Sequence, residues 1–169
     1  MKLDGSCHCG KVRFSVASHA PYPYMRCYCS ICRKTASSGG YGINLSGQFD
    51  TLRIVGGEHA KSYQVEKRQT EHGAGAPEGD PSSALRAYCV ACGTALWVYS
   101  PEWPELVHPF AGVIDTPLPT PPETVHIMLD HKAPWVEVPN GEGHKHFPGY
   151  PDESIEAWHR RHGLWEGGE

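Results

Sequence analysis

Cysteine is the residue type in this chain most capable of chemistry, because all seven cysteines fall into short clusters. The clusters are Cys7-x-Cys9, Cys27-x-Cys29-x-x-Cys32 and Cys89-x-x-Cys92, the last followed by Gly93. Such spacing is typical of metal ligation, and a closed structural zinc site uses four ligands. Seven thiolates therefore leave three for a second ion with an open coordination position, which is typical of a catalytic zinc.

Disulfides fit the same cysteines poorly. An odd count leaves one thiol over, and a two-residue step gives awkward geometry for a bridge. The first six residues contain no apolar targeting segment, and no stretch is long enough to span a bilayer. We therefore expect a cytoplasmic protein, since thiols stay reduced in the cytosol.

Composition predicts one domain without a nucleic-acid partner. A chain of 169 residues with 39% hydrophobic content can bury one core, so we expect a single zinc-binding domain over 1–169. Its core is expected at about 1–140, followed by a C-terminal extension. The net charge of −4 gives no positive field to hold a polyanion, and we expect no membrane partner either. The sequence leaves the oligomeric state open.

The elements that must position the cysteines read mainly as β-strands. Apolar residues alternate with polar ones in short segments, and 19 Gly and 15 Pro separate them. We expect strands at about 12–16, 41–45, 52–54, 63–65, 94–99, 106–110, 125–129 and 135–138. The fold class predicted is therefore mainly β with few short helices.

One helix and two loops complete the prediction. The helix is expected at about 152–162, with Asp152 as N-cap, Ile155 and Trp158 on one face, and Gly163 as its stop. Residues 73–83 are rich in Gly and Pro, and residues 116–123 are rich in Pro, so we expect surface loops there.

Position in the chain indicates how the seven thiolates are shared. The turn from Cys89 to Cys92 aims two sulfurs at one ion, and Gly93 supplies the positive φ that turns backbone N–H groups toward sulfur. Cys7 and Cys9 are the expected complement, because residues two apart on an extended strand project to one face. These four cysteines are predicted to form a closed structural site. Cys27, Cys29 and Cys32 lie within six residues and can converge on a second ion.

Two alternatives for the three-cysteine group stay open. A distant histidine could close it as a second structural site, with His126, His131, His144 and His146 available. An iron–sulfur cluster could also accept these thiolates, although no fourth cysteine lies nearby. The hydroxyls of Tyr28 and Ser30, between the ligands, could donate hydrogen bonds to sulfur or only pack.

Four segments carry a resemblance to a known family: residues 5–12 (GSCHCGKV), 27–34 (CYCSICRK), 86–93 (RAYCVACG) and 135–138 (WVEV). Over about the first 140 residues the chain resembles the glutathione-dependent formaldehyde-activating enzyme (GFA) family, which includes the centromere protein V domain. The resemblance implies an Mss4-like fold of β-sheets with two zinc ions per chain. It implies a structural zinc on four of the cysteines and a labile catalytic zinc on the other three: respectively Cys7, Cys9, Cys89 and Cys92, and Cys27, Cys29 and Cys32.

The activity implied by the resemblance is that of a carbon–sulfur lyase, which adds a thiol such as glutathione to an aldehyde such as formaldehyde or reverses the addition. Glutathione carries two carboxylates, so the basic residues beside the cysteines are candidate substrate ligands: Arg26, Arg33 and Lys34. Two other classes of function stay open, a non-enzymatic zinc module that binds a protein partner and a redox-sensing or metal-buffering protein. The sequence does not identify the thiol or the aldehyde.

Overall fold

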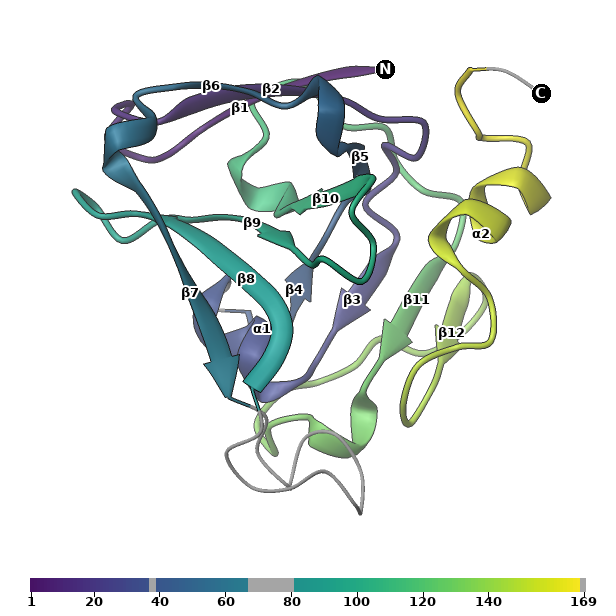
Figure 1. Cartoon of the computed structure of the whole chain (residues 1–169). Coiled ribbons are helices and arrows are strands. Elements are labelled where there is room, and N and C mark those ends of the chain that lie inside the picture. Colours follow the sequence, from purple (N-terminus) through teal and green to yellow (C-terminus); the bar gives the residue numbers. More distant parts are fainter. Residues whose placement is uncertain (37–38, 67–80, 168–169) are drawn as a thin grey trace.

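The computed structural model of the protein describes residues 1–36, 39–66 and 81–167. The strands among these residues form three sheets, accompanied by two short helices, one between the sheets and the other on the outside of the molecule near the C-terminus (Figure 1). The predicted fold class, mainly β with few short helices, is confirmed. No helix among these residues is both long and apolar enough to cross a membrane.

The first sheet has the strand order β1-β2-β6 and is antiparallel. Its strands are β1 (Lys2–Ser6), β2 (Arg13–Ala17) and β6 (Arg53–Val55). Leu3 pairs with Val16 and Gly5 with Phe14, so alternate residues enter the core. A Cβ on Gly5 would lie 2.5 Å from the Phe14 ring, which explains a glycine inside this strand.

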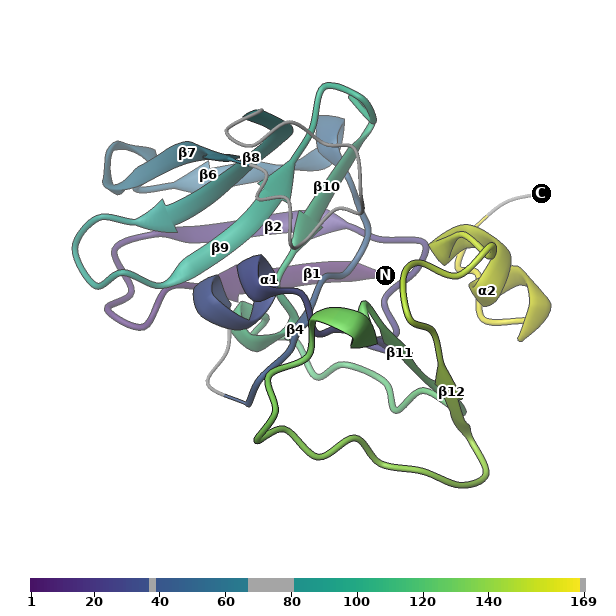
Figure 2. The ribbon, with the colours of Figure 1, turned by 90° about the horizontal axis from the view of Figure 1, so that it is seen from below.

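The second sheet has five antiparallel strands in the order β5-β10-β9-β8-β7. They are β5 (Gly47–Gln48), β7 (Ala60–Glu66), β8 (Pro81–Cys89), β9 (Ala95–Tyr99) and β10 (Leu106–Pro109). In the view from below, this sheet lies across the first (Figure 2). A shared core fills the space between them, and Phe14 meets Trp97 edge to face at a centroid distance of 5.2 Å.

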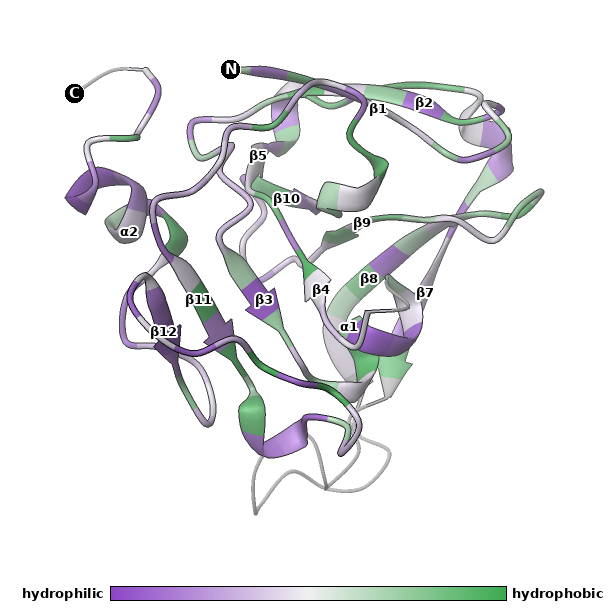
Figure 3. Ribbon diagram, turned by 180° about the vertical axis from the view of Figure 1, so that it is seen from behind, coloured by the Kyte–Doolittle hydropathy of each residue, from purple (hydrophilic) through white to green (hydrophobic). Residues whose placement is uncertain are grey.

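The third sheet has the order β12-β11-β3-β4, with β11 parallel to both β3 and β12. Its strands are β3 (Met25–Cys27), β4 (Gly42–Ile43), β11 (Thr124–Ile127) and β12 (His144–His146). Figure 3 shows β12 as hydrophilic, whereas β11 has hydrophobic bands on both sides of a hydrophilic one. A polar edge strand beside a buried one protects the sheet from pairing with another chain.

The helices are short. The two α-helices are α1 (Ser30–Thr35) and α2 (Ile155–Arg161), and single 3-10 turns are η1 (Phe49–Thr51), η2 (Gly57–His59), η3 (Ala111–Val113) and η4 (Leu129–His131). The helix predicted near the C-terminus is confirmed, and Gly163 has a positive φ of 67° after its end. Its N-cap is Ser154, not Asp152 as predicted, because the Ser154 hydroxyl accepts a hydrogen bond from the Ala157 amide.

Some strand predictions are wrong. Residues 135–138 form no strand, and Trp135 is 67% exposed while Val136 is buried in a turn. β6 is fully exposed rather than half-buried, because it is the edge of a small sheet. Of the loop predicted at 73–83, residues 73–80 lie outside the described residues. Residues 81–83 belong to β8 instead, where Pro81 pairs with Glu66. Residues 116–123 contain no strand or helix, as predicted.

Candidate metal centres

Four cysteines from two distant segments meet in one cluster, as predicted: Cys7, Cys9, Cys89 and Cys92. Their sulfurs all lie within 4.8 Å of one another. The Cys7 and Cys9 sulfurs are 3.5 Å apart, and the Cys9 and Cys89 sulfurs are 3.8 Å apart. Cys7 and Cys89 are buried in the core between the first two sheets, whereas Cys9 and Cys92 are exposed. The cluster therefore joins the β1–β2 turn to the β8–β9 turn at the rim of the core.

The two turns of this cluster have the same backbone design. In the first, the Cys7 amide donates to the Val12 carbonyl at 3.0 Å, and in the second, the Cys89 amide donates to the Thr94 carbonyl at 2.9 Å. Each turn contains a glycine with positive φ, Gly10 at 72° and Gly93 at 75°. The positive φ predicted for Gly93 is thus confirmed, but its own amide donates to the Cys89 carbonyl at 2.8 Å rather than to a sulfur.

One part of the geometric prediction is wrong. Cys7 and Cys9 do not lie two apart on an extended strand, because β1 ends at Ser6 and Cys9 belongs to the following turn. The turn itself brings both sulfurs to one side. The Val12 amide then donates to the Cys7 sulfur at 3.2 Å, the contact expected where an amide stabilises a thiolate ligand.

Thr94 links the two turns. Its hydroxyl accepts a hydrogen bond from the His8 amide at 3.2 Å and lies 3.1 Å from the Cys92 sulfur. Hydrogen bonds from the Thr94 side chain and backbone lower the pKa of Cys92 to about 5. A thiol with a lowered pKa is prepared to act as a thiolate ligand.

The three-cysteine cluster forms where β3 passes into α1. Cys27 ends β3, Cys29 is the N-cap of α1, and Cys32 lies within α1. The Cys32 amide donates to the Cys29 sulfur at 3.4 Å, so one candidate ligand also caps the helix. All three side chains are buried, and their sulfurs lie within 4.8 Å of one another.

A fourth protein ligand does not join this cluster within the part of the chain that the structure describes. Three of the histidines considered as closing ligands lie on β11 and β12 and contact one another: His126, His144 and His146. The His126 Nε2 is 3.0 Å from the His144 Nδ1. The seven cysteines are therefore divided into one cluster of four and one of three, as predicted.

Tyr28 separates Cys27 from Cys29 but points to the other side of the chain. Its hydroxyl lies 2.8 Å from the His126 Nδ1, and both side chains are fully buried. Burial, followed by the charges of His146, Arg26 and His144, lowers the pKa of His126 to about 4. Of the two roles considered for Tyr28, the structure gives packing and a hydrogen bond to histidine, rather than a hydrogen bond to sulfur.

Arg86 on β8 is a cation beside the three-cysteine cluster, and the sequence did not predict it there. It is only 9% exposed, and its Nη2 lies 3.8 Å from the Cys32 sulfur. Hydrogen bonds with Cys27 and Cys29, and then the charge and hydrogen bond of Arg86, lower the pKa of Cys32 against the opposing effect of burial. Strand periodicity could have indicated its position. Arg86 is three residues before Cys89 on one strand, so the two side chains project to opposite faces and Arg86 faces away from the four-cysteine cluster.

Tyr150 is a second site residue that the sequence did not indicate. Ile127 pairs with Cys27, and the amide of the next residue, Met128, donates to the Gly149 carbonyl at 2.9 Å. The segment that contains Tyr150 therefore lies near the cluster. Removal of water around its hydroxyl, and then the charges of the three cysteines, raise the pKa of Tyr150. The residue as a whole is 68% exposed. Tyr150 therefore lies close enough to the cluster for its phenol to be affected by the charges of the cysteines.

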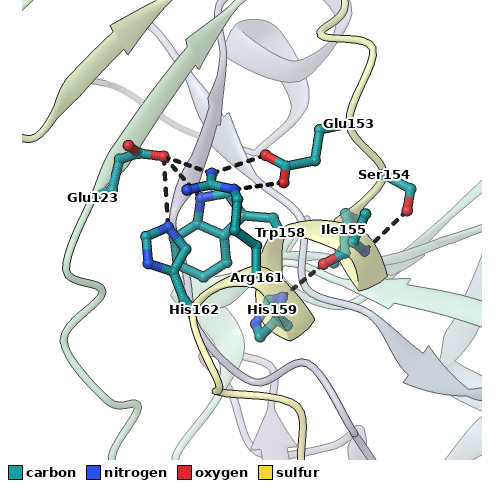
Figure 4. A network of polar contacts seen from close by, with 9 residues as sticks. Glu123, Glu153, Ser154, Ile155, Trp158, His159, Arg161 and His162 are labelled. Carbon is teal, nitrogen blue, oxygen red and sulfur yellow. Dashed lines mark hydrogen bonds and ion pairs between the residues drawn. The ribbon is translucent and has the colours of Figure 1, made fainter.

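The C-terminal segment that carries Tyr150 is held by contacts of α2. Trp158 stacks on Tyr24 at a centroid distance of 3.8 Å. The Nε1 of Trp158 donates to Glu123 at 3.0 Å (Figure 4). Arg161 pairs with both Glu153 and Glu123. A cavity of about 300 Å³ lies beside this network, and none of its described lining residues is a cysteine.

The predicted substrate ligands take three different positions. Arg26 lies on β3, and its guanidinium carbon is 4.9 Å from the Tyr41 ring centroid. Arg33 and Lys34 lie in the last turn of α1, where cations stabilise the helix dipole. Their role in binding a substrate stays a prediction.

Both clusters fit metal ions by their donor chemistry. Each consists of thiols alone, with sulfurs close enough to share one ion and backbone amides directed at sulfur. Thiolate ligands at this spacing suit zinc, which is commonly bound by four cysteines in structural sites. Clusters of four and three cysteines in one mainly β chain define a class of cysteine-rich proteins that could hold two metal ions.

Comparison with known proteins gives the family. The profile of the family described as glutathione-dependent formaldehyde-activating enzyme matches residues 2–131. A protein of Halomonas elongata, named "Putative glutathione-dependent formaldehyde-activating enzyme", is 56% identical over 167 residues, 99% of this chain and 100% of that protein. A crystal structure of a Rhodobacter sphaeroides protein is 27% identical and covers 70% of this chain and 92% of that chain, with a TM-score of 0.48. The chain belongs to the glutathione-dependent formaldehyde-activating enzyme family.

Proposed function

We propose that this protein is a zinc-dependent carbon–sulfur lyase that joins a small thiol to an aldehyde and catalyses the reverse cleavage. Glutathione and formaldehyde are the substrates suggested by the family name. The observation that carries the proposal is a buried cluster of three cysteines that no fourth side-chain ligand completes among the described residues. Such a cluster suits an ion whose remaining coordination position serves a substrate.

The two clusters are proposed to have different roles, one structural and one catalytic. Cys7, Cys9, Cys89 and Cys92 would hold a structural zinc, because they join two turns and close the ligand set. Cys27, Cys29 and Cys32 would hold a more labile zinc. Zinc bound there would supply the positive charge that keeps the sulfur of a substrate thiol ionised near neutral pH, where a free thiol has a pKa of about 8.5.

The reaction itself needs a nucleophilic sulfur and a proton for oxygen. A new bond forms between the thiol sulfur and the carbonyl carbon, the carbon–oxygen π bond breaks, and the oxygen gains the proton that the thiol loses. The product of glutathione and formaldehyde is S-(hydroxymethyl)glutathione. Tyr150 is proposed to donate a hydrogen bond to the aldehyde oxygen, since it is an exposed phenol close enough to the cluster to be affected by the charges of the cysteines.

The surroundings of the three cysteines suit a reaction at sulfur. The three cysteines lie in an apolar cluster with Tyr24, Val125 and Trp158, which limits water near the reacting sulfur.

We propose that the protein acts on small molecules in the cytoplasm, where its thiols remain reduced. Nucleic acid and membranes are not proposed as partners.

The reaction is tested with glutathione and ¹³C-labelled formaldehyde, whose uncatalysed exchange with the adduct can be followed by NMR exchange spectroscopy. The zinc-loaded protein is expected to raise the exchange rate above that of buffer. Cys29→Ser, purified with its four-cysteine site loaded, is the matched control and should give the buffer rate. Equal exchange rates in buffer, control and wild-type protein would contradict the proposed reaction and favour a binding role for the module.

A further inference from the structure

Arg86 is a buried arginine without a carboxylate partner among the described residues. Its Nη2 lies 3.8 Å from the Cys32 sulfur, and its Nη1 lies 3.5 Å from the Thr35 hydroxyl, the outer limit of a hydrogen bond. The guanidinium also lies over the Phe110 ring at 5.9 Å. Its Nε is buried and has no hydrogen-bond partner.

A buried guanidinium requires a nearby negative charge. Arginine does not lose its proton in proteins, and a buried unpaired charge is strongly destabilising. Thr35 and Phe110 carry no charge, so among the described residues in contact with Arg86 only the cysteine cluster can supply the negative charge. Three thiolates around one divalent ion carry a net charge of −1, which one arginine balances.

We infer that Arg86 is a positioning residue that sets the zinc affinity of the three-cysteine site by serving as the counter-ion of the zinc–thiolate cluster. The inference rests on the proposed function only in requiring a metal at this site. Arg86 lies on β8 of the second sheet and contacts the proposed ligand Cys32 in α1, so it acts through that ligand. Residues in contact with metal ligands commonly change metal affinity by about 10–100-fold when they are replaced.

Arg86 also favours one kind of fourth ligand. An ionised substrate sulfur would change the net charge of the loaded cluster from −1 to −2, whereas neutral water would leave it unchanged. A fixed cation beside Cys32 stabilises the more negative state. Arg86 should therefore strengthen the binding of a thiolate more than the binding of water.

The test measures metal binding rather than turnover. Zinc affinity is determined by competition with a chromophoric chelator, and cobalt(II) substitution reports thiolate ligation by its charge-transfer absorption. Arg86→Met is expected to weaken the lower-affinity site by about tenfold or more and to leave the higher-affinity site unchanged. Arg86→Lys keeps the charge without the planar fork and should lie between Arg86→Met and wild type.

Two matched controls separate charge from packing. Thr35→Val removes the oxygen partner of Arg86 but leaves its charge, so zinc affinity should stay within about threefold of wild type. Arg26→Met removes another partly buried arginine, one that faces Tyr41, and should leave both zinc affinities unchanged.

A folded Arg86→Met protein with wild-type affinity at both sites would overturn the inference. If that variant does not fold, Arg86→Gln is compared with Arg86→Lys, and equal zinc affinities in these two would also overturn it. A wild-type protein that binds zinc only at the four-cysteine site would instead contradict the proposed function, and the two failures are therefore distinguishable.

Discussion

The Nη2 of Arg86 lies 3.8 Å from the sulfur of Cys32, although 54 residues separate them in the sequence. Arg86 shares β8 with Cys89, which belongs to the four-cysteine cluster. One strand therefore contributes a cysteine to one candidate metal centre and a charged neighbour to the other.

The two clusters should differ in their importance for folding. Cys89→Ser removes a buried ligand that joins two turns, and loss of a structural metal belongs to the class of changes that cost about 4 kcal/mol or more. We expect its melting temperature to fall by about 8–16 °C. Cys29→Ser should lower the melting temperature much less, because it leaves the four-cysteine cluster complete. Calorimetry of both variants checks this, and equal losses would show that the division of roles is wrong.

His126 should make stability depend on pH. Its pKa in the folded protein is about 4, below the ordinary value of 6.5, so the unfolded chain binds more protons between these values. The stabilisation is complete above pH 6.5 and is lost as the pH falls toward 4, by about 2 kcal/mol at pH 5. Thermal melts at pH 7 and pH 5 should therefore show a smaller decrease for His126→Gln than for wild type. Acid loss of zinc affects both proteins, so the same pH dependence in both would refute a neutral, buried His126.

Trp158 should anchor the C-terminal segment. It is 1% exposed, stacks on Tyr24 and donates a hydrogen bond to Glu123. Trp158→Ala is expected to cost about 3–5 kcal/mol, and Trp158→Phe, which keeps the ring stack, about 1–3 kcal/mol. Urea unfolding monitored by circular dichroism distinguishes these values. The prediction is wrong if the two variants are equally stable.

Tyr150 should matter for activity but not for stability. Because it is 68% exposed, Tyr150→Phe should change the stability by no more than about 0.5 kcal/mol. Loss of the proposed hydrogen bond to the aldehyde oxygen should slow catalysed exchange about tenfold. The NMR exchange assay and a thermal melt of the same sample measure both quantities. Wild-type exchange by Tyr150→Phe would remove Tyr150 from the proposed mechanism.

The sequence predicted those parts of the fold whose signal is local. Apolar alternation located β2, and runs rich in apolar residues located β9, β10 and β11. Gly93 was correctly given a positive φ. The grouping of cysteines by four and three was also predictable, because thiol clusters at this spacing have few other uses.

The parts that escaped prediction depend on tertiary contacts. α1 is only six residues long and is stabilised by the Cys29 sulfur cap, which no periodicity reveals. β3 is short and owes its strand structure to pairing with β11 and β4. Arg86 and Tyr150 reach the three-cysteine cluster from remote segments, so their spacing in the chain carries no sign of their neighbours.

The measurement that tests the central claim most directly is the number of zinc ions per chain, before and after dialysis against a mild chelator or millimolar glutathione. Two zinc ions are expected in the fully loaded protein, with one lost on dialysis while circular dichroism shows an intact fold. Cys29→Ser should hold one zinc throughout. Retention of both zinc ions under every condition would show that both sites are closed and structural, and would contradict a catalytic zinc at Cys27, Cys29 and Cys32.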